Sequence, residues 1–111
     1  MDSILTSIKK LLGISEEYTQ FDDDIIIHIN SVLLNLTQLG VGPEEGFFIE
    51  DDTADWEDFV DIESNAQLQA IKTYVYLKVK LLFDPPLSSA VIESTNRMIS
   101  ELEWRLNVAV E

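Results

Sequence analysis

Apolar residues recur at helical spacing in four segments of this chain. The first segment covers residues 2–12, with Asp2 or Ser3 placed as an N-cap and Gly13 placed as a left-handed stop. Its apolar stripe has the spacing of an amphipathic helix and consists of Ile4, Leu5, Ile8, Leu11 and Leu12. We therefore predict a first helix over residues 2–12.

A second helix is predicted over residues 22–39, ending before Gly40. It begins at three aspartates, Asp22 to Asp24, which we expect to cap the first free amides and to face the positive end of the helix dipole. Its main apolar face consists of Ile25, Ile26, Ile29, Val32, Leu33 and Leu36. Ile27 and Leu34 lie off this face and hint at a second contact surface.

The third predicted helix, residues 64–83, is apolar around most of its circumference. This pattern is typical of a central helix, and in a small domain such a helix can also be covered by a neighbouring subunit. A proline pair, Pro85 and Pro86, ends the helix because proline lacks an amide hydrogen and disfavours a helical residue before it. Lys78 falls on the widened apolar side, where its stem is buried while its amine reaches water, or where it pairs with an acidic group of another subunit.

The fourth predicted helix, residues 88–108, is capped by Ser88 or Ser89. Its predicted core stripe consists of Val91, Ile92, Thr95, Met98, Ile99, Leu102 and Leu106. Trp104 lies off this stripe, on the face that carries Arg97. Tryptophan is enriched at interface hot spots, so Trp104 either contacts a partner or folds back onto its own domain.

Residues 40–64 show no sustained periodicity and form a long predicted loop. Loops of this length are typically functional or disordered, and the aromatic residues argue against disorder. The sequence allows a short strand at residues 47–49 and one helical turn at residues 55–61 that buries Trp56 and Phe59. We therefore predict a single, mainly α domain over residues 1–111: a small bundle of about four helices with a long acidic loop between the second and third helices.

Charge is distributed unevenly along the chain. Between Lys10 and Lys72 there is no lysine or arginine, yet 15 of the 21 acidic residues lie there. Ten carboxylates between Glu44 and Glu63 alternate with large apolar side chains, a pattern that we interpret as a surface made to meet another surface. The candidate contact residues in the loop are Phe47, Phe48, Ile49, Trp56 and Phe59. The candidates in the C-terminal part are Lys72, Lys78, Lys80, Arg97, Trp104 and Arg105.

The composition excludes several functional classes. A net charge of -14 argues against duplex DNA as a ligand, because phosphate affinity comes from lysine and arginine. There is no cysteine, His28 is the single histidine, and no glycine-rich phosphate loop is present. The aspartates Asp51, Asp52 and Asp55 lack the calcium-loop pattern. We expect no enzyme activity, no cofactor and no metal. No apolar run approaches the roughly 20 residues that span a bilayer and the N-terminus does not resemble a signal peptide, so we expect a soluble protein without membrane contact.

Six short segments occur in an order that resembles a known family. They are Phe21 to Ile25, Gly40 to Pro43, Asp55 to Phe59, Tyr74 to Lys78, Leu82 to Pro86 and Glu101 to Leu106. Together they resemble the head–tail connector proteins of long-tailed bacteriophages, also called head-completion or adaptor proteins, over nearly the whole chain. The third helix, the proline pair and the long last helix are the most specific parts.

The resemblance implies a function in contacts rather than catalysis. It implies a ring, twelve-fold in the virion, that forms beneath the portal protein after DNA packaging and joins the head to a tail-side neck or stopper protein. DNA would pass through the channel without specific binding. The protein would be located in the virion neck, and in the host cytoplasm during assembly. The residues alone do not fix the subunit number.

A ring of identical subunits needs two different complementary surfaces on each chain. We therefore expect the loop from Gly46 to Asp61 to pack against the third or fourth helix of the next subunit. The main alternative is an acidic regulator that binds another protein as a DNA mimic. An enzyme, or a helical bundle of unassigned role, are the remaining interpretations.

Overall fold

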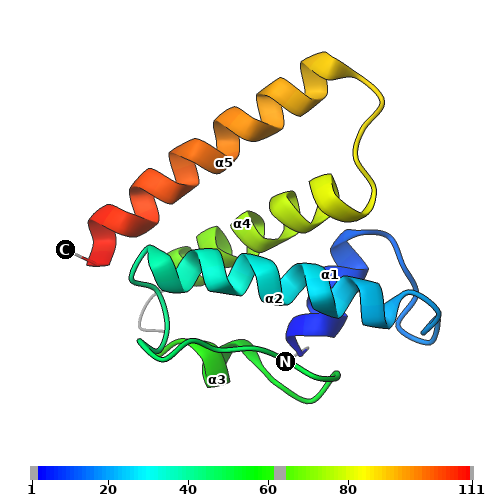
Figure 1. Cartoon of the computed structure of the whole chain (residues 1–111), viewed down its shortest axis with the longest axis horizontal. Helices are drawn as coiled ribbons and strands as arrows, with labels where there is room; N and C mark the ends of the chain where they lie inside the picture. Colours follow the sequence, from blue (N-terminus) through cyan, green and yellow to red (C-terminus); the bar gives the residue numbers. More distant parts are fainter. Residues whose placement is uncertain (1–2, 62–64, 111) are drawn as a thin grey trace.

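The computed structural model describes residues 3–61 and 65–110 and is mainly α, as predicted (Figure 1). The helices within these ranges are α1 (Ile4–Leu11), α2 (Asp22–Gln38), α3 (Trp56–Phe59), α4 (Asn65–Phe83) and α5 (Ser89–Val110). The four long helices lie at the predicted places, and α3 is the helical turn predicted inside the loop. Asp2 and Ser64, expected at helix starts, lie outside the described residues.

The helix predicted to be central, α4, is central. It packs against α1, α2 and α5. Figure 1 shows α2 crossing α4, with α5 on one side of this pair and the loop that carries α3 on the other. None of the helices in the described part of the chain is long and apolar enough to cross a membrane.

The start of α1 follows its sequence signal, whereas the start of α2 does not. Ser3 caps α1, and its Oγ accepts a hydrogen bond from the Thr6 amide at 3.1 Å. The expectation that Asp22 to Asp24 cap α2 is wrong, because Phe21 occupies the N-cap position and no side chain caps this end. The three carboxylates instead occupy the first helical turn, where they still face the positive end of the dipole.

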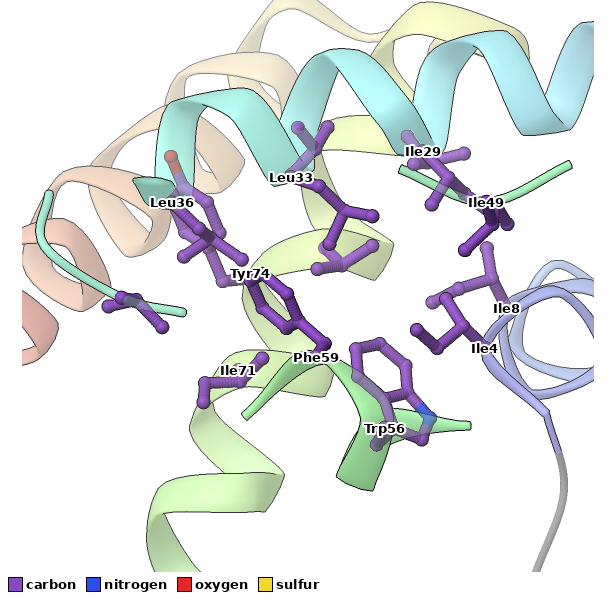
Figure 2. Packing of buried hydrophobic residues seen from close by; sticks show 14 of the residues in the cluster. Ile4, Ile8, Ile29, Leu33, Leu36, Ile49, Trp56, Phe59, Ile71 and Tyr74 are labelled. Atoms are coloured by element: carbon purple, nitrogen blue, oxygen red, sulfur yellow. The ribbon is translucent and has the colours of Figure 1, made fainter. Parts of the chain in front are cut away.

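The core is formed by α1, α2 and α4 together with residues of the loop. Figure 2 shows Trp56 and Phe59 pointing toward side chains of these three helices. Trp56 has no exposed surface, and its Nε1 donates a hydrogen bond to Ser7 Oγ at 3.1 Å. The loop therefore closes one side of the core, and its aromatic residues supply part of the buried apolar area that stabilises the fold.

The predicted core stripe of α5 is only partly covered. Ile99 and Leu106 are buried, whereas Val91 and Met98 are about half exposed. The reason is that α5 packs mainly on α4, so one neighbouring helix shields one narrow strip of its surface. The rest of the stripe remains available to a partner.

Candidate interaction surfaces

The loop between α2 and α4, whose described part is residues 40–61, is called the acidic loop below. Ile49, Trp56 and Phe59 are at most 2% exposed and belong to the core of their own chain. We expected these three side chains to meet a second subunit, and the structure corrects this expectation to a role in the core. Phe47 is half-buried and packs on Phe59, with ring centroids 5.4 Å apart.

Residues 47–49 are extended but form no strand within the described residues, so the short strand allowed by the sequence is replaced by a different pairing. The side-chain amide of Asn30 in α2 takes the place of a neighbouring strand. Its Oδ1 accepts a hydrogen bond from the Ile49 amide at 2.7 Å, and its Nδ2 donates one to the Ile49 carbonyl at 3.0 Å.

This anchoring decides which way the neighbouring side chains face. In extended backbone, successive side chains point to opposite sides. Phe47 and Ile49 face the core, so Phe48 between them faces outward and is 66% exposed. Phe48 is thus the large apolar side chain that the acidic loop presents to solvent.

The carboxylates of the acidic loop form a negative surface around Phe48. Glu44, Glu45, Glu50, Asp51 and Asp52 are all exposed. Hydrogen bonds from the Thr53 hydroxyl and amide lower the pKa of Asp51, so this carboxylate is held firmly in its charged form.

Two further carboxylates of the acidic loop have a structural role. Asp55 and Asp58 form a capping box at α3, in which Asp58 Oδ2 accepts a hydrogen bond from the Asp55 amide at 2.8 Å. The cap fixes the start of α3 and thereby the place of Trp56 in the core.

Most of the basic residues predicted to pair with the loop instead pair with acids near them. Lys80 contacts Asp84 at 2.9 Å, and Arg105 contacts Glu101 at 2.6 Å, both between helical neighbours four residues apart. Exposed pairs of this kind contribute little stability. Arg97 is exposed and makes no ion pair within residues 3–61 and 65–110. None of these three cations is paired with the described part of the acidic loop.

Lys72 and Lys78 lie closer to the core. Lys72 Nζ lies 5.9 Å from the centroid of the Trp56 ring, so the loop is contacted by a lysine of its own chain. Lys78 is partly buried, with its Nζ 5.5 Å from the Tyr74 ring centroid and 3.9 Å from Glu103. The partial burial of Lys78 agrees with the interpretation that its stem is covered while its amine stays near the surface.

Sequence reasoning missed the buried cation Lys9. Its Nζ lies 2.8 Å from Asp22 and donates hydrogen bonds to the carbonyl oxygens of Glu16 and Tyr18 at 3.1 and 2.8 Å. These contacts tie α1 to the start of α2 and to the connection between them. The signal was present, since Lys9 follows Leu5 by four residues and therefore lies beside the apolar stripe of α1.

A second missed contact joins α4 to α5. The Tyr74 hydroxyl donates a hydrogen bond to Glu103 at 2.8 Å. Burial, together with this bond to a carboxylate, raises the pKa of Tyr74 well above its ordinary value. A tyrosine within an apolar helix gives no sequence signal for the partner of its hydroxyl.

Two open grooves flank α5 where it lies on α4. The groove between α1, α4 and α5 has a volume of about 550 Å³ and is called the α1-side groove. The groove between α2, α4 and α5 has a volume of about 720 Å³ and is called the α2-side groove. Concave, largely apolar surfaces of this kind are where partners and ligands bind.

The two grooves differ in charge. The α1-side groove is lined by Leu11, Leu77 and Met98 and by two lysines, Lys10 and Lys72, with no carboxylate among its lining residues. The lining of the α2-side groove includes both members of the Lys78–Glu103 ion pair. The α1-side groove is therefore positively charged in a strongly acidic protein.

The outer face of α5 carries Trp104, which is 67% exposed as its position off the stripe predicted. Ile27 and Leu34 on α2 are also exposed, in agreement with their position off the main face of that helix. His28 lines the α2-side groove. The described residues contain no group of three or more histidine, aspartate or glutamate side chains placed to hold a metal ion.

These features define a small helical protein whose distinctive elements are contact surfaces. The family model described as phage connector protein matches residues 4–111, and the chain belongs to this family. Its role is that of a structural head–tail connector, which implies association with portal and tail components. No curated protein and no solved structure matches the chain significantly.

Proposed function

We propose that this protein forms a ring below the portal that joins the DNA-filled phage head to the tail and continues the DNA channel. The observation that carries the proposal is the family match over residues 4–111. The structure supports it with two unlike surfaces, an acidic loop and a positively charged groove. A closed ring requires such a pair, because each subunit contacts its two neighbours through different surfaces.

The charge of the protein suits a channel for DNA. The net charge is -14, and exposed carboxylates are concentrated on the acidic loop. Carboxylates that line the bore would repel the phosphate backbone, since adhesion to DNA requires cations that displace its counterions. DNA would then slide past the ring instead of binding to it.

We further propose that the outer face of α5 contacts a neighbouring neck component, either the portal or a tail-side stopper. Trp104 is the largest exposed side chain on this face. The guanidinium groups of Arg97 and Arg105, on the same helix, add positive charge to it. Tryptophan and arginine are the residue types most enriched where single side chains dominate binding.

The decisive experiment mixes the purified protein with DNA-filled heads that carry portal but lack this protein. Electron microscopy should then show a ring of added density at the portal vertex, and tails should attach to the completed heads. Heads without portal provide the control and should gain no density. Unchanged portal vertices after mixing would contradict the proposed function.

A second experiment tests the proposed role of the acidic surface. Glu44, Glu45 and Asp52 are exposed and make no hydrogen bond or ion pair within the described part of the chain, so their replacement should leave the fold intact. The triple change to lysine should weaken ring formation or slow DNA ejection, while the triple change to glutamine should have a smaller effect. Normal assembly and normal ejection in the lysine variant would count against the role of these charges.

A further inference from the structure

The acidic loop presents one aromatic side chain on a fixed backbone. Phe48 is 66% exposed, while the next residue, Ile49, is buried and held by two hydrogen bonds from Asn30. A side chain displayed in this way loses little conformational entropy when it binds, because its backbone is already ordered. Exposed aromatic residues that fill a pocket on a partner commonly dominate the binding energy.

We propose that Phe48 inserts into the α1-side groove of a second copy of this chain and forms the head-to-tail contact of the ring. This inference rests on the proposed function. Leu11, Leu77 and Met98 supply an apolar floor for the aromatic ring. Lys10 and Lys72, at the same groove, face the carboxylates that flank Phe48.

Charge selects this groove over the other one. The α2-side groove includes the Lys78–Glu103 pair, so its cation already has a carboxylate partner within the same chain. The α1-side groove has two lysines and no carboxylate in its lining. Complementary charge across an interface speeds association and fixes its register. The strongly acidic segment around Phe48 therefore fits the α1-side groove.

The two surfaces are positioned for a heterologous contact. The lining of the groove comes from α1, α4 and α5, and no described residue of the acidic loop contributes to it. One chain can therefore insert its Phe48 into one neighbour while its own groove receives the Phe48 of another. Repetition of such a contact closes a ring when the rotation between subunits is suitable.

The absence of cysteine from the chain makes a covalent test possible. A double variant, Phe48→Cys with Met98→Cys, places one thiol on the loop and one in the groove. Heads that lack the wild-type protein would be completed with this variant, inspected by electron microscopy and oxidised mildly. We expect a ladder of covalent trimers and longer species on a non-reducing gel. Each single-cysteine variant is the control, since one thiol per chain cannot link more than two chains.

Substitution provides the second measurement. Phe48→Ala should reduce the amount of ring assembled on heads by about 10- to 30-fold, as expected for loss of a dominant contact residue. Ile27→Ala is the matched control, because Ile27 is similarly exposed at 61% but lines neither groove, and it should assemble normally. Lys72→Glu should also weaken assembly, and combination with Glu50→Lys should restore part of the loss.

The outcomes separate this inference from the proposed function. If the double-cysteine protein adds density at the portal vertex but yields no ladder, and Phe48→Ala assembles normally, the inference is overturned while the ring proposal stands. If no variant and no wild-type protein joins the portal vertex, the proposed function itself fails. A cross-link from the thiol that replaces Met98 to a portal or tail protein would assign the groove to that partner and overturn the inference.

Discussion

Asn30 holds Ile49 through both polar groups of its side-chain amide. The contact spans 19 positions of the sequence and joins α2 to the acidic loop. It satisfies the backbone donor and acceptor of a residue that is buried without a neighbouring strand. The orientation of the aromatic residues around Ile49 depends on this single side chain.

Replacement of Asn30 should therefore loosen the loop. We expect Asn30→Ala to lower the free energy of unfolding by about 1–3 kcal/mol, because two hydrogen bonds are lost at a partly buried site. Urea unfolding gives the stability, and hydrogen exchange at the Ile49 amide reports the local change. Asn96→Ala, at an exposed position on α5, is the control. Unchanged protection of the Ile49 amide would contradict the prediction.

The buried lysine should matter more than any surface lysine. Lys9→Met leaves Asp22 and two carbonyl oxygens without their cation, and we expect a loss of about 2–4 kcal/mol in the free energy of unfolding. The control is Lys80→Met, which removes an exposed pair with Asp84 and should change stability by less than about 0.5 kcal/mol. Equal effects of the two substitutions in urea unfolding would disprove the assigned role of Lys9.

Gly42 is required for a steric reason. Its φ is +85°, and a Cβ atom built there would lie 2.5 Å from Cε1 of Phe59. We expect Gly42→Ala to destabilise the fold by about 2–4 kcal/mol, since left-handed strain and overpacking act together.

Gly13→Ala is the matched control for Gly42→Ala. Gly13 has a similar φ of +81°, but its Cβ would meet nothing within 4 Å. This substitution should cost only about 1 kcal/mol. Thermal unfolding of the two variants separates steric overlap from backbone strain, and equal losses would refute the steric account.

Tyr74 makes the fold sensitive to alkaline pH. Its raised pKa means that the folded state disfavours the tyrosinate, so the stability that Tyr74 contributes is fully present below the unfolded pKa of 10.0 and is lost as pH rises above it. We expect Tyr74→Phe to lower stability by about 1 kcal/mol at neutral pH and to lose less further stability than wild type above about pH 10.

Urea unfolding at a series of alkaline pH values checks this prediction. Tyr18→Phe is the control, because Tyr18 is 45% exposed and its hydroxyl bonds the side chain of Gln20 at an exposed site. This variant should follow the wild-type curve. A Tyr74→Phe variant with an unchanged slope above about pH 10 would show that Tyr74 does not control the alkaline loss.

Helices could be predicted from the sequence because their signals are local. Apolar spacing placed α2 and α4 within a residue or two, and the proline pair after Phe83 marked the end of α4 correctly. The exposure of Ile27 and Trp104 also followed from helical geometry alone. The order of short segments was enough to indicate the connector family, which the family match confirms.

The candidate site was predicted less well. Trp56 and Phe59 were assigned to a subunit contact because aromatic residues stood among carboxylates, yet both are core residues. Lys80 and Arg105 were expected to face the acidic loop but pair with helical neighbours. Charge counts show which signs are present, but they do not show which groups are close in space.

The sequence by itself determined the four long helices, the acidic loop and the family of this protein. Only the tertiary structure decided which loop side chains are buried, because an irregular segment has no period from which its faces can be read. Those faces are set by contacts between distant residues, such as the hydrogen bonds of Asn30 to Ile49. The same anchoring leaves Phe48 in solvent, where a second subunit can reach it.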